Sequence, residues 1–288
     1  MKHIIILLVA AAVSASVFAA KRQHSEANIE VTYQYDYAVA TVDSLNYKSD
    51  KMLLQIAPDE SRFFSVKTEF YDSLAASPGG KDMINDMVLD ALNKSGGIKR
   101  DTDGNITSVT VSYDAMKDVP RRGVCVNVYK YPGENIMTVY DRIQSGDNAL
   151  YTWDVPCDEI VWEPGDSTMT ILGYECQSAT ADYHGRLWTA WYAPEIPVSE
   201  GPWQFCGLPG LILYAVSDGD EYRFTATAIN RCNTQIKDIP GEPHTEKCTR
   251  KDFRMLEADI VANPGKNYGI AVPNKGKVHH DLIETDYR

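Results

Sequence analysis

A long alternation of apolar and polar residues near the N-terminus limits the folds open to this chain. From Ile29 to Val39, apolar side chains occupy every second position, which places them on one face of a β-strand. Shorter runs of the same kind follow, separated by stretches rich in Gly, Asp or Asn that favour tight turns. Such spacing indicates an antiparallel meander of short strands.

The pattern predicts a mainly β (α+β) fold. The expected strands are 29–39, 52–56, 62–66, 106–113, 124–131, 136–143, 149–155, 168–173, 176–183, 187–193, 211–216 and 221–229. Helical spacing of apolar residues predicts a helix over 82–92, and further short helices are expected at 67–76 and 250–261. Strands of this kind form a sandwich, a barrel or a curved sheet. We expect a strongly curved antiparallel sheet or half-barrel with two or three short helices.

Composition excludes several classes of protein. The 288 residues include 40 Asp and Glu against 28 Lys and Arg, a net charge of −12, which disfavours a protein that coats nucleic acid or anionic lipid. A hydrophobic fraction of 44 % is enough for a folded core, and a mean hydropathy of −0.31 argues against a polytopic membrane protein. We therefore expect neither a nucleic-acid partner nor an integral membrane protein.

Residues 1–19 have the layout of a secretory signal peptide. Lys2 precedes an apolar run from Ile4 to Val13, and small residues then lead to Ala19. The apolar run is short for a membrane anchor, which needs ~20 residues. We expect cleavage after Ala19, a periplasmic or secreted protein, and one β-rich domain over 20–288 with a polar C-terminal tail from about 263.

Every cysteine lies in the predicted mature part of the chain. An even number in an exported protein favours disulfides, so the disulfide candidates are Cys125, Cys157, Cys176, Cys206, Cys232 and Cys248. The sequence does not select one pairing, although Cys232 with Cys248 is the most local. A structural zinc site is the competing interpretation, but the chain has no C-x-x-C pair.

The most distinctive motifs lie between Ile171 and Ile229. They are Gly173-Tyr174-Glu175-Cys176, Gly185-Arg186, Ala190-Trp191-Tyr192, Glu195-Ile196-Pro197, Gly201-Pro202-Trp203 and Gly207-Leu208-Pro209-Gly210-Leu211-Ile212. In this order they resemble the GLPGLI family of exported proteins, found largely in Bacteroidota, and residues 61–65 and 71–73 are similar to its N-terminal half. The resemblance implies an exported, largely β protein and brings no settled biochemical activity. Of the cysteines, only Cys176 lies in the family motif.

The end of this segment is a candidate binding loop, made of Trp203, Phe205, Gly207, Leu208, Pro209, Gly210 and Leu211. Pro209-Gly210 suits the centre of a type II turn, in which Gly210 takes a positive φ. Trp203 and Phe205 would bury large aromatic surfaces. Two interpretations remain open: a structural corner locked against the sheet, or a binding loop at the mouth of a groove.

Motifs that would indicate catalysis are absent or weak. A Cys–His nucleophile would need Cys176 or Cys206 close to His184 or His244, and the Gly-x-Ser-x-Gly motif of serine hydrolases does not occur. Residues 101–105 depart from the order of a calcium loop and predict a hairpin turn instead. His279-His280 could hold a transition metal but fit a solvated tail better. We expect no cofactor, no metal and no catalytic residue.

Three functions remain as hypotheses. The first is an exported, non-enzymatic binding or carrier protein, in which the concave sheet and helix 82–92 frame an apolar cleft. Such an arrangement resembles, at the level of the fold alone, the half-barrels of periplasmic lipoprotein carriers. The partner is unknown, and an apolar small molecule, a peptide and an outer-membrane protein all remain open. The second is a structural accessory of an outer-membrane complex that pairs through an edge strand, and the third is an enzyme.

Overall fold

The computed structural model describes residues 22–41, 44–110, 114–143, 149–241, 244–262 and 282–287. The predicted signal peptide, His279-His280 and most of the predicted tail lie outside these residues. The strands are β1 (Glu26–Thr41), β2 (Ser44–Ile56), β3 (Ser61–Ser65), β4 (Ile98–Arg100), β5 (Ile106–Val109), β6 (Asn127–Tyr131), β7 (Ile136–Asp141), β8 (Leu150–Pro156), β9 (Glu163–Ile171), β10 (Tyr174–Tyr183), β11 (Arg186–Ala193), β12 (Leu211–Ser217), β13 (Tyr222–Gln235) and β14 (Thr245–Lys247).

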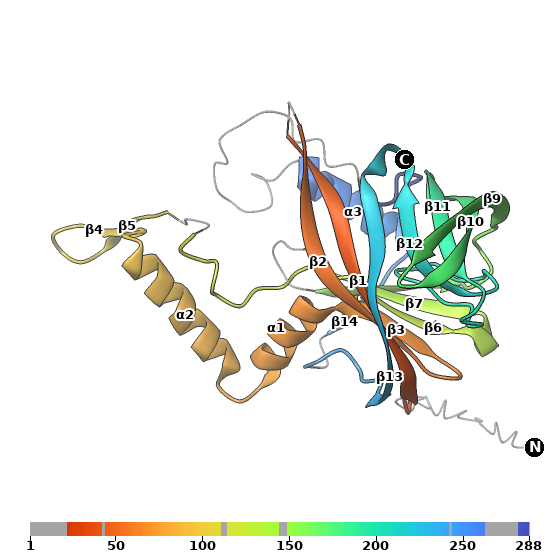
Figure 1. The fold of residues 1–288 in the computed structure, drawn as a ribbon. Helices are drawn as coiled ribbons and strands as arrows, with labels where there is room; N and C mark the ends of the chain where they lie inside the picture. The colour runs from red at the N-terminus through yellow and green to blue at the C-terminus, as the bar shows by residue number, and fades with distance from the viewer. Residues whose placement is uncertain are drawn as a thin grey trace, which may run out of the picture.

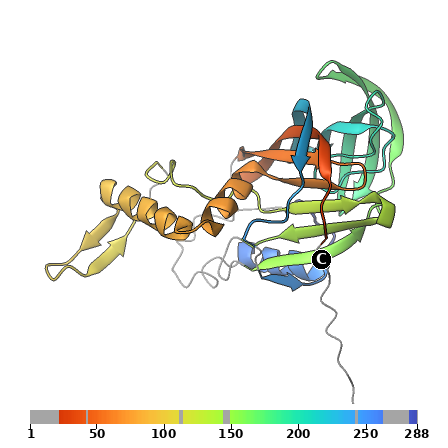
Figure 2. The same cartoon turned by 90° about the horizontal axis from the view of Figure 1, so that it is seen from below.

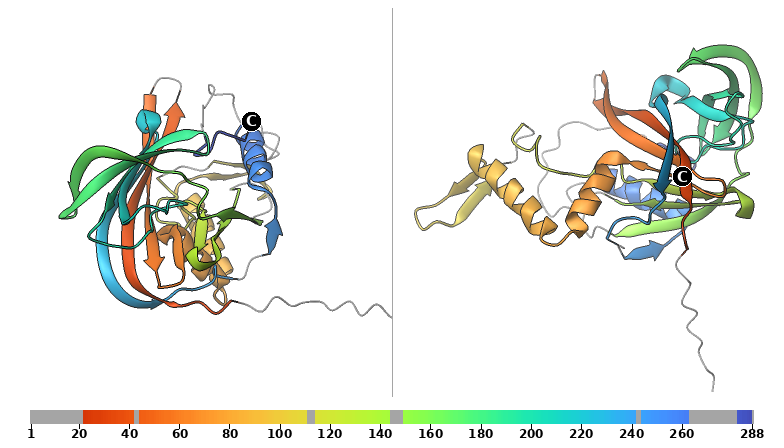
Figure 3. Two further views of the ribbon diagram at one scale, coloured as in Figure 1. Left: turned by 90° about the vertical axis from the view of Figure 1, so that its right-hand side faces the viewer. Right: turned by 60° about the horizontal axis from the view of Figure 1, so that its bottom comes forward.

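One sheet dominates the molecule (Figure 1). Its 12 strands follow the order β14-β8-β7-β6-β3-β2-β1-β13-β12-β11-β10-β9. Neighbouring strands are antiparallel, except that β14 runs parallel to β8. The sheet curves strongly, and its concave side faces α3 (Arg250–Ala262) (Figure 3). This confirms the expected mainly β fold with a curved antiparallel sheet and short helices.

The helices lie in two separate places. α1 (Val66–Ala76) and α2 (Gly80–Lys94) join the β4–β5 hairpin in an arm that extends away from the sheet (Figures 1 and 2). The prediction that helix 82–92 frames the concave face is therefore wrong, and α3 has that position. An amphipathic pattern shows which helix face is buried but not which surface buries it; here α2 packs on α1. Among the described helices, none combines the length and apolarity needed to cross a membrane.

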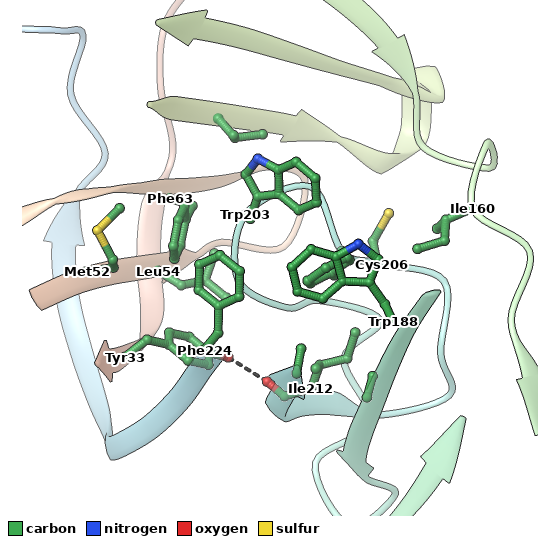
Figure 4. Packing of buried hydrophobic residues seen from close by; sticks show 14 of the residues in the cluster. Tyr33, Met52, Leu54, Phe63, Ile160, Trp188, Trp203, Cys206, Ile212 and Phe224 are labelled. Atoms are coloured by element: carbon green, nitrogen blue, oxygen red, sulfur yellow. Dashed lines mark hydrogen bonds between the residues drawn. The ribbon is translucent and has the colours of Figure 1, made fainter. Parts of the chain in front are cut away.

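Aromatic side chains fill the centre of the core (Figure 4). The ring of Phe205 lies 4.8 Å from that of Trp188 and 5.1 Å from that of Trp203, measured between centroids. Phe224 of β13 packs against the same group. The hydroxyl of Tyr33 donates to the carbonyl of Ile212 at 2.6 Å, which joins β1 to β12. The core therefore ties the segment 200–212 to strands from the whole length of the chain.

Turn-forming sequences predict the positions of the hairpins in the described residues, with one exception. Tyr183 pairs with Arg186, and the two residues between them, His184 and Gly185, have φ values of 53° and 82°, as a type I′ turn requires. Pro164-Gly165-Asp166 predicts a further turn before the expected strand 168–173, and this prediction is wrong, because these residues lie inside β9. β9 is an edge strand, where Pro164 needs no partner for its missing N–H.

Candidate functional site

A cavity of about 430 Å³ lies between the concave face of the sheet and α3. The sheet contributes Tyr35 and Phe224, α3 contributes Arg254 and Ile260, and Leu282 comes from the C-terminal segment. Small-molecule sites of known proteins have volumes of roughly 300–1,000 Å³. We call this space the α3 cavity.

One wall of the α3 cavity is aromatic. The ring centroid of Tyr35 lies 4.4 Å from that of Phe224, 5.2 Å from that of Tyr37 and 6.4 Å from that of Tyr222, and all three pairs are stacked. Burial raises the pKa of Tyr35 and of Tyr37. Both phenols are therefore neutral at physiological pH, and the wall offers flat apolar faces with uncharged hydroxyl groups.

The other end of the α3 cavity is polar and is organised by Arg254. This side chain is 2 % exposed. Its Nη1 donates to Glu257 Oε2 at 2.8 Å, its Nη2 donates to Glu284 Oε1 at 2.8 Å, and Asp141 Oδ2 lies 3.7 Å from Nη1. The guanidinium carbon sits 5.1 Å from the ring centroid of Phe253. The Nε atom is buried and has no hydrogen-bond partner among the described residues.

Two carboxyl groups near Arg254, those of Asp141 and Glu284, have pKa values shifted in opposite directions. Burial raises the pKa of Asp141 to about 7, and the charge of Arg254 offsets this only in part. Burial also acts to raise the pKa of Glu284, but the charges of Arg254 and His184 and the hydrogen bonds from Arg254 and Arg250 hold it at about 2. Asp141 can therefore exchange a proton near neutral pH, whereas Glu284 remains ionised.

The candidate binding loop is mostly packed into the protein. Trp203, Phe205, Leu208 and Leu211 are at most 5 % exposed, and Gly210 is also buried. Gly207 and Pro209 are exposed. Of these residues only Trp203 lines the α3 cavity. Most of the loop thus packs into the core, as a structural corner would, and Trp203 is the one loop residue that lines the cavity.

Lys130 of β6 holds the start of this corner. Its ammonium group, 1 % exposed, donates to Glu200 Oε2 at 3.1 Å, to the Gly201 carbonyl at 2.8 Å and to the Phe205 carbonyl at 2.6 Å. These three acceptors satisfy all of its donors. A buried charge with complete hydrogen bonding fixes the path of the backbone before Trp203.

The expected type II turn at Pro209-Gly210 is wrong. Gly210 does not have a positive φ, whereas Gly207 does, at 92°. The amide of Gly210 instead donates to the Leu208 carbonyl at 2.8 Å, which closes a three-residue γ-turn around Pro209. Glycine is required at position 210 for space, because an added Cβ would lie 2.4 Å from the Ala193 carbonyl oxygen.

The expected disulfides are not formed in this structure, where all six cysteines carry free thiols: Cys125, Cys157, Cys176, Cys206, Cys232 and Cys248. Cys232 lies in β13 and Cys248 directly follows β14. These two strands are far apart in the order of the sheet, so the local pair Cys232–Cys248 does not form. Cys232 Sγ is directed at the Ala27 carbonyl at 3.2 Å, and Cys248 Sγ at the Thr152 carbonyl at 3.9 Å. Cys206 Sγ lies 3.1 Å from the carbonyl oxygen of Cys157.

His184, Glu284 and Asp286 are brought close together, with potential ligand atoms within 4.8 Å of one another. Arg250 donates to Glu284 at 3.0 Å and to Asp286 at 2.7 Å, so a guanidinium already bridges both carboxylates. A divalent metal would have to displace this guanidinium. The cluster therefore serves to attach the C-terminal segment to α3.

Comparisons with known proteins cover part of the chain. A family model described as "Protein of unknown function (Porph_ging)" matches residues 183–214, which include β11 and the buried corner. No curated protein sequence matches the chain. Two solved structures of PNGF-II, in space groups P21 and C2, are similar to 81 % of this chain with TM-scores of 0.47 and 0.45 and 14 % identity. The aligned part covers 33 % of the PNGF-II chain in each case, so this chain spans about a third of their length.

Proposed function

We propose that this chain is an exported member of the GLPGLI family that binds a small molecule with a largely apolar body in the α3 cavity. The order of motifs between residues 171 and 229 supports the family, together with the match at residues 183–214. The observation that carries the binding function is the α3 cavity, about 430 Å³ in volume, with an aromatic wall and one polar end.

The lining of the α3 cavity favours a ligand over water. Partly exposed apolar residues of the lining, among them Tyr37, Val126 and Ile260, gain free energy when an apolar molecule covers them. A small number of polar groups at one end would fix the orientation of such a molecule. α3 and the C-terminal segment form one side of the cavity, to which they contribute Arg254, Ile260 and Leu282.

A pair of tryptophan substitutions on α3 tests this function. Ile260 lines the α3 cavity, and Ile260→Trp should obstruct it and weaken binding of N-phenyl-1-naphthylamine, an uncharged dye that fluoresces in apolar sites. Met255 is 45 % exposed on the same helix, and Met255→Trp should bind the dye as wild type does. Equal dye binding by all three proteins would show that the dye, and by extension the ligand, does not occupy this cavity.

A docking role is the second candidate function, and the arm is the observation that favours it. Phe70 of α1 is 61 % exposed, and Met83 and Leu89 of α2 are 46 % and 51 % exposed. Apolar side chains exposed in such a projecting element fit a protein partner. A photo-crosslinking residue at Phe70 should then give a product in intact cells, while the same residue at Met255 gives none.

A further inference from the structure

Arg254, which lines the α3 cavity, carries an unused hydrogen-bond donor. Both Nη atoms of Arg254 are engaged by carboxylates, Glu257 at 2.8 Å and Glu284 at 2.8 Å. The Nε–H has no acceptor among the described residues, although it is buried. Buried donors are rarely left without a partner, and an orphaned one calls for an explanation such as an absent ligand.

We infer that the bound molecule has a head group with an oxygen acceptor, a carboxylate or an ester carbonyl, that accepts a hydrogen bond from Arg254 Nε. This rests on the proposed function. The apolar body of the molecule lies along the stacked rings of Tyr35, Tyr222 and Phe224. The ligand class is therefore an acyl compound rather than an amine or a plain hydrocarbon.

The polar groups at this end of the cavity suit an oxygen acceptor better than a cationic head. Arg254 pairs with Glu257 and Glu284, and Arg142 Nη2 lies 3.8 Å from Asp72 Oδ2. Burial raises the pKa of Asp141 to about 7, so a good part of this group is a protonated donor at neutral pH. An ammonium head would meet cations and donors at this end, and an oxygen acceptor would meet partners.

A series of ten-carbon compounds separates the head group from the apolar body. Decanoic acid, methyl decanoate and decylamine have the same chain and differ in the head, as an anionic acceptor, a neutral acceptor and a cationic donor. Each is titrated against wild-type protein loaded with N-phenyl-1-naphthylamine. We expect at least one acceptor compound to displace the dye at a concentration about tenfold or more below that of decylamine. Preference for decanoic acid over its ester would identify the carboxylate form.

Equal displacement by all three compounds would overturn the head-group inference and leave the cavity function intact. Failure of the dye to bind, or dye binding that Ile260→Trp does not change, would instead remove the proposed function itself. The two failures are therefore distinguishable in one set of titrations.

Conservative variants of two arginines test the donor directly. Arg254→Lys keeps the positive charge and loses the Nε–H. The ratio of the affinity for acceptor compounds to the affinity for decylamine should therefore fall toward one, while the affinity for decylamine stays unchanged. Arg250→Lys is the matched control, because Arg250 also pairs with Glu284 but does not line the cavity. Loss of the preference in both variants would mean that it depends on the fold and not on the Arg254 Nε–H. If Arg254→Lys does not fold, the wild-type series with the three compounds tests the head-group inference by itself.

Discussion

Trp203 has a φ of 51°, in a region that bulky side chains rarely occupy. Such a conformation persists only where its surroundings enforce it, and here Trp188 and Phe205 pack around the ring at centroid distances of 5.7 and 5.1 Å. The same ring lines the α3 cavity. At the scale of single residues, Trp203 therefore connects the packing of the core to the proposed ligand.

Gly210→Ala should destabilise the protein by about 1–3 kcal/mol, as other overpacked sites do. The added Cβ would lie 2.4 Å from the Ala193 carbonyl oxygen, which is backbone and cannot rotate away. Gly133→Ala is the control, because its Cβ would have no heavy atom within 4 Å. Urea unfolding of both variants measures this, and equal midpoints would contradict the close approach at Gly210.

Lys130→Met should lower the free energy of unfolding by about 3–5 kcal/mol, because Glu200 would remain buried without its counter-ion. The double variant Lys130→Met with Glu200→Gln removes the stranded charge and should recover part of that loss. Chemical denaturation should give the highest free energy of unfolding for wild type, a lower one for the double variant and the lowest for Lys130→Met. A single variant as stable as wild type would mean that Lys130 does not hold the corner.

At the scale of elements, α3 is held in place mainly by charge. Arg254 and Arg250 both bind Glu284, which is fully buried and also accepts from Gln204 Nε2 at 3.2 Å. Phe253 adds aromatic contact with Trp153 at a centroid distance of 4.9 Å. The helix that closes the cavity is thus tied to the corner at residue 204 and to the C-terminal segment through one carboxylate.

The attachment of α3 should weaken in acid. The pKa of Glu284 falls from 4.5 to about 2 on folding, so its charge stabilises the fold above pH 4.5 and this contribution is lost as the pH falls toward 2. Glu284→Gln cannot titrate. The stability difference between wild type and Glu284→Gln should therefore shrink between pH 4.5 and pH 2, as followed by thermal unfolding. A constant difference across this range would contradict the shifted pKa.

Sequence patterns predicted most of these elements and few of their positions. The alternation at β1, the turn at residues 184–185 and the helical spacing at 250–261 depend on neighbouring residues, and these predictions are confirmed. The packing of α2 on α1 and of α3 over the sheet depends on the whole fold. The sequence did not single out Asp141 or Arg254 as site residues, because a single charged residue becomes a candidate only once it is known to be buried.

At the scale of the whole molecule, the two candidate functions depend on different regions. The curved sheet and α3 line the cavity, and the arm of α1, α2 and the β4–β5 hairpin projects away from the sheet (Figure 2). A ligand needs the first region and a protein partner needs the second. The two candidate functions therefore predict separate effects for substitutions at Ile260 and at Phe70.

Export is a property of the full chain and is tested on the full chain. We expect the mature protein to begin at Ala20, because the small residues before it match a signal-peptidase site. N-terminal sequencing of protein from the cell envelope reads the first residue directly. A protein that retains Met1 in the cytoplasm would contradict both the signal peptide and the proposed location.

The measurement that tests the central claim most directly is the native mass of the protein purified from its own cell envelope, compared with its denatured mass. The account predicts an excess of a few hundred daltons that is lost on denaturation, within the size range that such cavities hold, and is absent from Ile260→Trp purified in the same way. A bare monomer in both preparations would contradict a ligand in the α3 cavity and would favour the arm as the functional surface.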